Sequence, residues 1–284
     1  MIKNKKSFLT IALLSLIMLM SIVSGCGSTT ASNDKSTDNS LAKIKEKGTL
    51  VVGMNADFAP YEFHAMVDGK DTIAGFDADV AREIAKDMGV KLEIKELSFD
   101  ALMTTLQSKQ VDVLISGLSA TKERRKSVDF TDSYYHSPNV VLTTKEKLSQ
   151  FNTFDDLKGK KIGVQLSSLQ DHLMSKLLPD GNFSRIDSMS TLMLSLSQGQ
   201  IDAIVTAEDT CKMAIASNPD LVIAKDIKID DSSLDSPGVA VALPKDSPAL
   251  KEQMNKTIKR LKDSGEFAKF VDKACALAAS QQKK

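Results

Sequence analysis

The sequence predicts an α/β protein of two lobes, each a sheet flanked by helices, joined by two hinge crossings. Three observations predict this fold. Strand patterns alternate with amphipathic helix patterns from Leu41 onward, which is typical of parallel strands linked by crossover helices. One helix-to-strand run recurs later in the chain without a break in register. Two extended stretches connect the two copies of this plan.

The chain begins with a segment that we expect to be an export signal, residues 1–25, and not part of the fold. Three early lysines precede an apolar run from Phe8 to Val23, which is short for a membrane span of roughly 20 residues. The run ends at Val23-Ser24-Gly25-Cys26, which resembles the lipobox of bacterial lipoproteins. This resemblance implies cleavage before Cys26 and a lipid on that cysteine, which would anchor the protein to the membrane.

Residues 26–40 are predicted to be a flexible tether, because they are rich in Ser, Thr, Asn and Asp and nearly devoid of apolar residues. Removal of the signal takes away three lysines and no acid, so 37 basic against 37 acidic residues becomes a net charge of minus three. A nearly neutral globule offers no electrostatic case for binding nucleic acid.

The first lobe is expected to contain alternating elements. Their predicted ranges are a strand at 48–54, a helix at 75–88, a strand at 90–97, a helix at 99–109 and a buried strand at 111–115. Ligands bind such sheets beyond the carboxyl ends of the strands. The candidate site residues that follow strand ends are Asn55, Asp57, Phe58 and the residues from Ser116 to Ser119.

The second lobe is predicted from a repeat. A new first strand starts at Lys161, and the run from Leu102 to Ile115 matches the run from Leu192 to Val205 at one constant offset. The equivalent strand ends, Ser116 and Thr206, are therefore expected to face each other across a cleft.

The chain is expected to cross between the lobes twice, after His136-Ser137-Pro138 and again near Ser236-Pro237-Gly238. These crossings place lobe 1 at residues 41–138 plus 238–284 and lobe 2 at residues 139–237. Helix patterns at 247–264 and 266–279 complete lobe 1. Cys211 and Cys275 either pair in an oxidising compartment or remain free in the core.

The stretch from Leu114 to Phe130 carries the clearest chemical signal. Thr121 is a good helix N-cap, yet Lys122, Arg124 and Arg125 place positive charge where the helix dipole is already positive. A bound anion, held by the Arg124 guanidinium and by Ser119, would resolve this conflict. A solvated basic turn is the alternative.

Several segments together resemble the extracellular solute-binding proteins of polar amino-acid ABC importers, which include the lysine/arginine/ornithine, histidine and glutamine binding proteins. The resemblance covers nearly all of residues 41–273. It rests on the stretch above and on V-G-M-N-A-D-F-A-P-Y-E-F, G-F-D-A-D-V-A-R-E-I-A, F-D-A-L-M-T-T-L, L-K-G-K-K-I-G-V-Q and G-Q-I-D-A-I-V. It implies a type II periplasmic-binding-protein-like fold that closes on an amino acid and delivers it to a permease driven by an ATPase.

The resemblance also implies how an amino acid is held. Its carboxylate would bind Arg124 and Ser119 from lobe 1 and Ser168 and Leu169 from lobe 2. Its ammonium group would lie beside the Gly117 backbone. Its side chain would contact Phe58, Asn55, Phe99, Tyr61 and Ser116.

One position departs from the family pattern. An acid normally follows the strand I-D-A-I-V-T and pairs with the ligand's ammonium group, but this chain has Ala207 there, with Glu208 next. We expect a local shift of the chain, or the longer side chain of Glu208, to restore the pairing. If no acid reaches the cleft, the ligand would be a non-standard amino-acid-like solute, because a buried ammonium group without a partner is costly.

Related folds also include dehydratases and cell-wall lytic enzymes, so an enzyme is the alternative reading. The sequence has no HExxH, G-x-S-x-G, paired CxxC or Gly-rich phosphate loop. We therefore predict a monomeric binding protein with no catalytic residue, metal or cofactor, lipid-anchored at the extracellular face of a bacterial membrane.

Overall fold

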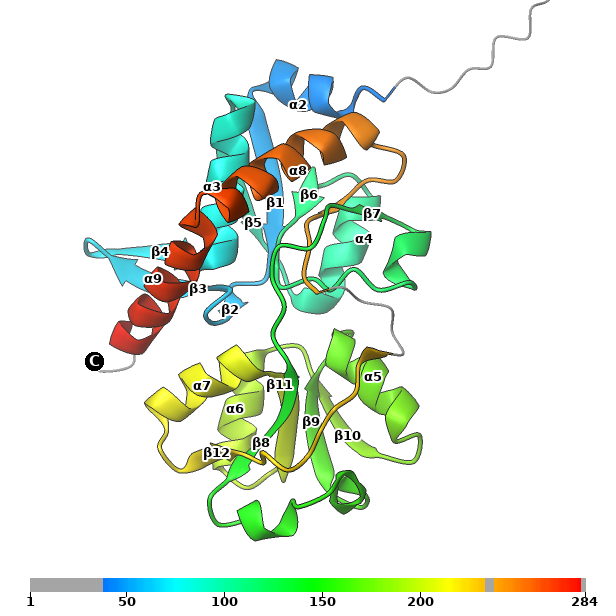
Figure 1. Ribbon diagram of the computed structural model, residues 1–284, viewed down its shortest axis with the longest axis vertical. Coiled ribbons are helices and arrows are strands. Elements are labelled where there is room, and N and C mark those ends of the chain that lie inside the picture. Colours follow the sequence, from blue (N-terminus) through cyan, green and yellow to red (C-terminus); the bar gives the residue numbers. More distant parts are fainter. Residues whose placement is uncertain (1–37, 233–237, 282–284) are drawn as a thin grey trace, which may run out of the picture. The chain divides into compact units, whose positions relative to one another are not determined.

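The computed structural model describes residues 38–232 and 238–281. The predicted signal, Cys26 and most of the predicted tether therefore lie outside the described residues. Within the described part, the strands form two five-stranded sheets and one three-stranded sheet (Figure 1). Each five-stranded sheet belongs to one lobe, which confirms the predicted α/β class.

Lobe 1 is built on a mixed sheet whose first three strands are parallel. The order across the sheet is β5 (Lys91–Glu96), β1 (Thr49–Met54), β6 (Val113–Leu114), β13 (Ala242–Leu243) and β7 (Asp129–Phe130). Strand β13 is antiparallel to both of its neighbours. The regular part of β6 is shorter than the predicted strand at 111–115, although Val111 and Ile115 are both buried.

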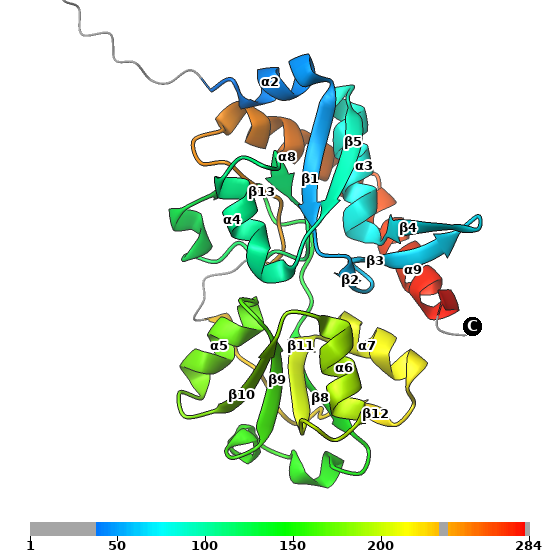
Figure 2. The same cartoon turned by 180° about the vertical axis from the view of Figure 1, so that it is seen from behind.

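Helices cover both faces of this sheet, as the ribbon shows from either side (Figures 1 and 2). Strand β1 alternates between the faces: Val52 packs in the core cluster that contains helix α3, and Val51 packs against the cluster that contains helix α4. The helices of lobe 1 are α2 (Ser40–Lys47), α3 (Phe76–Met88), α4 (Leu102–Gln107), α8 (Pro248–Asp263) and α9 (Glu266–Gln281). A 3-10 turn, Phe99–Ala101, leads into α4.

Lobe 1 also contains a small antiparallel sheet that the sequence analysis did not predict. Its strands are β2 (Asp57–Phe58), β3 (Glu62–Val67) and β4 (Lys70–Ala74). The β3–β4 turn is Asp68-Gly69, with φ of 51° and 75°, the left-handed conformation that two-residue hairpin turns require.

Lobe 2 repeats the plan of lobe 1. The order across its sheet is β10 (Asn182–Ile186), β9 (Lys161–Gln165), β11 (Ala203–Ala207), β8 (Asn139–Thr144) and β12 (Leu221–Ile223). Its helices are α5 (Leu169–Leu177), α6 (Met189–Ser197) and α7 (Glu208–Ser217), with 3-10 turns at Leu148–Gln150 and Phe154–Leu157. Strand β8 is antiparallel to β11, as β13 is to β6 in lobe 1.

The chain passes from β7 in lobe 1 to β8 in lobe 2 through an extended segment around Tyr135. The returning chain pairs with this segment, because the Val239 N–H donates to the Tyr135 carbonyl at 2.9 Å and the Tyr134 N–H donates to the Val239 carbonyl at 3.0 Å. The predicted domain boundaries remain predictions.

Both cysteines in the described residues are free. Cys211 is buried in α7 and Cys275 is half-buried in α9. Among the described helices, none is both long and apolar enough to cross a bilayer.

Candidate functional site

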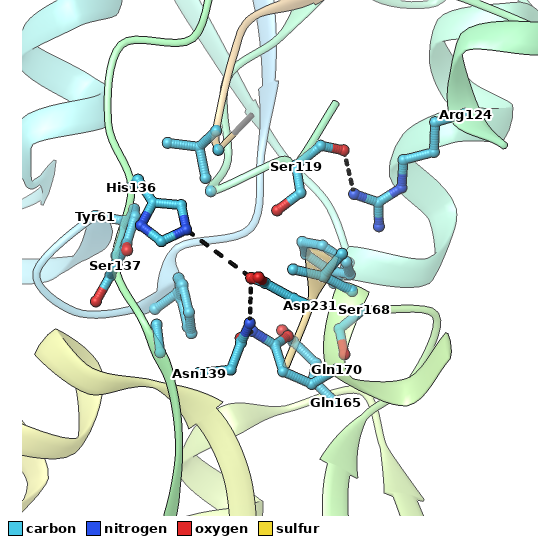
Figure 3. A pocket seen from close by; sticks show the side chains of 17 residues that line it. Tyr61, Ser119, Arg124, His136, Ser137, Asn139, Gln165, Ser168, Gln170 and Asp231 are labelled. Carbon is cyan, nitrogen blue, oxygen red and sulfur yellow. Dashed lines mark hydrogen bonds and ion pairs between the residues drawn. The ribbon is translucent and has the colours of Figure 1, made fainter. Parts of the chain in front are cut away.

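A pocket lies between the two lobes, where the strands of both sheets end (Figure 3). The lining residues enclose about 550 Å³ of space outside the protein atoms, a volume that includes open solvent at the mouth of the pocket. Lobe 1, the crossings and lobe 2 all contribute to it. The lining residues are Phe58, Tyr61, Phe99, Gly117, Ser119, Arg124, His136, Ser137, Asn139, Gln165, Ser168, Leu169, Gln170, Ala207, Asp231, Gly238 and Val239.

Arg124 lies at the pocket wall and reaches from lobe 1 to lobe 2. Its Nη1 donates to the Ser119 carbonyl at 3.0 Å, and its Nη2 donates to the Ser167 carbonyl at 3.0 Å. The guanidinium carbon lies 5.8 Å from the centroid of the Phe99 ring. Burial lowers the pKa of Arg124 to about 10, so the guanidinium remains charged at neutral pH.

Among the described residues, no carboxylate lies within 4.0 Å of this guanidinium, and its hydrogen-bond acceptors are two neutral carbonyls. A partly buried cation with neutral partners favours an anion as ligand. The nearby N-terminus of α5 has the same preference.

The prediction of a helix that starts at Thr121 was wrong. The structure has only a 3-10 turn, Arg124–Lys126, in which the Thr121 hydroxyl accepts a hydrogen bond from the Arg124 N–H at 3.2 Å. The segment after Thr121 is almost entirely charged and so has no apolar face to pack as a helix. The argument from a helix dipole at this position therefore does not apply, and the case for an anion rests on Arg124 and on α5.

The start of α5 faces the pocket from lobe 2. Ser168 is its N-cap and accepts from the Asp171 N–H at 3.1 Å, which leaves the Ser168 hydroxyl proton free to donate elsewhere. The N–H groups of Leu169 and Gln170 belong to the first turn and have no acceptor within the helix. These donors and Arg124 surround a space suited to a carboxylate.

The aromatic side chains of the pocket pack on each other. Phe58 and Tyr61 have ring centroids 4.8 Å apart at an interplanar angle of 31°. Phe58 lies directly over Gly117, where a Cβ atom would approach the Phe58 ring to 3.2 Å. Gly117 also has φ of 56°, so both its conformation and this contact require glycine.

The Gly117 N–H points away from the pocket. It donates to Asp77 Oδ2 at 2.7 Å, and the Tyr134 hydroxyl donates to Asp77 Oδ1 at 2.8 Å. Gly117 therefore offers its carbonyl, and not its N–H, to a ligand. An ammonium group needs an acceptor, so the expected contact with the Gly117 backbone would involve this carbonyl, and it stays a prediction.

Ser116 does not line the pocket, contrary to expectation. It is fully buried, its hydroxyl donates to Glu62 Oε1 at 2.8 Å, and its oxygen accepts from the Asn55 N–H at 2.9 Å. Burial and then the neighbouring Asp77 raise the pKa of Glu62 well above its usual range. Ser116 thus supports the loop that carries Gly117 and does not itself face a ligand.

Asn55 is also absent from the pocket wall. Its Nδ2 donates to the Leu97 carbonyl at 3.0 Å, and its Oδ1 accepts from Gln165 Nε2 of lobe 2 at 3.2 Å. Of this pair, Gln165 is the residue that lines the pocket.

Glu208 is placed away from the pocket. Strand β11 ends at Ala207, which lines the site, and α7 begins at Glu208, whose carboxylate pairs with Lys212 at 3.3 Å. The side chain of Glu208 is not among the lining residues, so this geometry does not favour it as the partner of an ammonium group.

Asp231 is an acid in the pocket that the sequence analysis missed. Its Oδ2 accepts from Asn139 Nδ2 at 2.9 Å and lies 3.9 Å from His136 Nε2 (Figure 3). The segment around Asp231 has neither strand nor helix periodicity, so no pattern marked it. His136, Asn139, Gln165 and Gln170 were likewise not predicted to line the site.

The lobes also meet beside the pocket. The Asp57 carboxylate of lobe 1 accepts from the Ser188 hydroxyl at 2.8 Å, from the Ser190 N–H at 3.2 Å and from the Ser190 hydroxyl. Ser188 is the N-cap of α6, so an anion from one lobe lies at the positive end of a helix in the other.

The described residues contain no group of three or more His, Cys, Asp or Glu side chains that could hold a metal ion.

Comparison with known proteins places this site in context. Residues 50–275 match the model of bacterial extracellular solute-binding proteins, family 3. The chain is 35% identical over 229 residues to the arginine-binding extracellular protein ArtP of Bacillus subtilis, covering 80% of this chain and 86% of that one. It is 40% identical over 190 residues to a probable histidine-binding protein of Campylobacter jejuni, covering 67% and 72%.

Solved structures agree. An amino acid ABC transporter substrate-binding protein, AbpA of Streptococcus pneumoniae bound to L-arginine, superposes with a TM-score of 0.80 at 39% identity over 84% of this chain and 99% of that chain. An ancestral amino acid-binding protein, described as a precursor of cyclohexadienyl dehydratase, has a TM-score of 0.73 at 28% identity over 82% and 98%. These relatives are binding proteins and not enzymes, and the chain belongs to the bacterial extracellular solute-binding proteins of family 3.

Proposed function

We propose that this chain captures a polar amino acid between its two lobes and delivers it to the permease of an ABC importer, which an ATPase drives. The observation that carries the proposal is the charged guanidinium of Arg124 between two neutral carbonyls, beside the open N-terminus of α5. These groups are the donors that recognise a carboxylate.

The rest of the pocket suits the remainder of an amino acid. Phe58, Tyr61 and Phe99 offer flat apolar surfaces, and Gln165 and Gln170 offer amide groups. Relatives are named for arginine, histidine and cystine, which share the α-carboxylate and α-ammonium groups and differ in side chain. The proposal therefore covers the polar amino acids as a class.

We further propose that the protein acts as a monomer at the extracellular face of the membrane, held by a lipid on Cys26. The support is the order of a basic start, an apolar run and Val23-Ser24-Gly25-Cys26 in the sequence. Mass spectrometry of the membrane fraction would detect the lipid. A mature protein that keeps residues 1–25 would contradict this part of the proposal.

A thermal-shift screen tests the binding function. The domain without residues 1–37 is heated with each standard L-amino acid and with L-cystine, and each hit is titrated by calorimetry. A ligand at about 100 times its dissociation constant stabilises the folded state by about 2.7 kcal/mol, which is a measurable shift. Analysis of each hit for chemical change after incubation separates binding from catalysis.

Arg124→Ala provides the decisive variant. Removing one partner of a buried charge pair costs roughly 2–5 kcal/mol, so we expect the dissociation constant of every hit to rise by at least about 30-fold. The matched control is Arg125→Ala, since Arg125 is exposed and does not line the pocket. An Arg124→Ala variant that binds as tightly as the control would overturn the assignment of the carboxylate site.

A further inference from the structure

We infer that Asp231 is the residue that pairs with the ligand's α-ammonium group and so replaces the acid that is absent at Ala207. This inference rests on the proposed function, because it assigns the second charge of the same ligand. The assignment follows from strand register, from the hydrogen bonds of one asparagine and from the charges of the pocket.

Strand register places Asp231 beside the missing side chain. Ala207, at the end of β11, is paired with Asn139 on the neighbouring strand β8. The Asn139 amide in turn donates to Asp231 Oδ2 at 2.9 Å. The carboxylate therefore lies next to the position that a longer side chain at residue 207 would occupy, although it comes from a different part of the chain.

Asn139 is oriented for this role. Its Oδ1 accepts from Gln170 Nε2 at 2.7 Å, which directs its Nδ2 hydrogens toward Asp231. Gln170 belongs to the first turn of α5, the helix that faces the carboxylate site. The same short chain of amides thus fixes Asp231 relative to the proposed carboxylate site.

The charges of the pocket fit a zwitterion. Among its described lining residues, Asp231 is the only carboxylate and Arg124 is the only side chain with a permanent positive charge. Asp231 Oδ1 has no hydrogen bond to the described residues, and 28% of the side chain is exposed, so it remains able to accept from a ligand. A pocket with one group of each sign fits the two α-substituents of an amino acid.

The small side chain at residue 207 is consistent with this arrangement. An acid there would lie near Asp231, and two carboxylates in one site repel each other until one takes up a proton. With alanine at residue 207, the space beside Asp231 stays free, and Asp231 provides the negative charge at this place in the pocket.

The experiment separates the ammonium group from the rest of the ligand. L-arginine, L-histidine and L-glutamine are the probes, each compared with its des-amino analogue, in which hydrogen replaces the α-ammonium group. Binding of each pair is measured by calorimetry to the wild type, to Asp231→Asn and to Asp230→Asn. The last is the matched control, because Asp230 is exposed and lies outside the pocket.

We expect Asp231→Asn to weaken amino-acid binding by at least about tenfold while it changes the binding of the des-amino analogue by less than about threefold. Asp230→Asn should change neither. Adding Ala207→Asp to Asp231→Asn should restore part of the lost affinity, because the new acid is the cross-strand neighbour of Asn139. If Asp231→Asn fails to fold, Asp231→Ser is measured in the same way.

Equal loss of affinity for an amino acid and its analogue would overturn the inference, as would an Asp231→Asn variant that binds like the wild type. In both cases amino-acid binding by the wild type would leave the proposed function intact. A wild type that binds no standard amino acid and no cystine would instead refute the proposed function, and this inference with it.

Discussion

The central strands of the two lobes can be compared residue by residue. In lobe 1, Leu114 of β6 pairs with Gly53 of β1, and in lobe 2, Ile204 of β11 pairs with Gly163 of β9. A Cβ atom on Gly53 would approach the Leu114 side chain to 2.6 Å, and one on Gly163 would approach the Ile201 side chain to 2.7 Å. Each lobe therefore uses a glycine at the same place to let a helix-to-strand unit pack closely.

The aspartates that precede these two strands also make equivalent hydrogen bonds. Asp112 accepts from the Val51 N–H at 2.7 Å and from Lys47 at 2.7 Å. Asp202, its equivalent, accepts from the Lys161 N–H at 2.9 Å and from Lys147 at 2.6 Å.

The hydroxyl residues toward the carboxyl ends of the same strands differ in their hydrogen bonds. Ser116 of lobe 1 bonds to Glu62 and Asn55, whereas the Thr206 hydroxyl of lobe 2 is buried with no partner among the described residues. The frame of each lobe is thus shared, and the differences are concentrated at the carboxyl ends of the strands, where the pocket lies.

The largest expected effect is a difference in stability between substitutions of Ser116 and of Thr206, the equivalent residues toward the carboxyl ends of the two strands. Ser116→Ala leaves the Asn55 N–H and Glu62 Oε1 without their partner, so we expect a loss of about 1–3 kcal/mol in the free energy of unfolding. Thr206→Val replaces an unpartnered hydroxyl with a methyl group of similar size and should leave stability unchanged or raise it. Urea unfolding monitored by circular dichroism measures both, and equal losses would remove the contrast.

The second prediction concerns the equivalent aspartates that precede these strands. Asp112→Ala and Asp202→Ala each remove the acceptor of one backbone N–H and one lysine, so each should cost about 1–2 kcal/mol. The two costs should agree within about 0.5 kcal/mol. Asp155→Ala is the control, because its pair with Lys158 is exposed and worth little. Clearly unequal losses in the free energy of unfolding would show that the two lobes share the geometry of these contacts but not their contribution to stability.

The third prediction depends on pH and concerns a buried carboxyl group of lobe 1. The raised pKa of Glu62 means that the folded protein keeps a proton that the unfolded chain releases above the ordinary range of glutamate, about pH 4.3. Glu62 Oε2 has no hydrogen-bond partner among the described residues, and the negative charge of the nearby Asp77 further disfavours the ionised form of Glu62. Wild-type stability should therefore fall as pH rises through this window.

Glu62→Gln removes this titration while it keeps the shape of the side chain. Its free energy of unfolding relative to wild type should rise with pH, by at most about 1.4 kcal/mol per pH unit. Urea midpoints of both proteins at about pH 4 and about pH 7 measure the effect. Parallel changes in the two proteins would mean that Glu62 is ionised in the folded state.

Much of this fold could be predicted because buried strands and amphipathic helices leave periodic patterns. The match of Leu102–Ile115 with Leu192–Val205 predicted the two-lobe plan, and the strand register confirms it. The β2–β4 sheet was missed, although Asp68-Gly69 is a typical hairpin turn.

The site was harder to predict. Of the predicted ligand contacts, Arg124, Ser119, Phe58 and Ser168 line the pocket, whereas Ser116 and Asn55 bond to protein partners. The ligand contacts themselves stay predictions. A sequence gives the place of a residue along a strand end and not the direction of its side chain. Asp231 comes close to Asn139 only through tertiary structure, so no local pattern could indicate it.

The contacts of Asp57 with the start of α6, and of Arg124 with the Ser167 carbonyl, join the lobes through groups of the chain alone. Part of the free energy that favours the closed arrangement of the lobes is therefore independent of ligand. A fraction of the molecules will close without ligand. A permease that recognised only the closed conformation would hydrolyse ATP with ligand-free binding proteins. Productive import then requires a further difference between the ligand-free and ligand-bound closed forms, such as a longer lifetime of the closed form when an amino acid is bound.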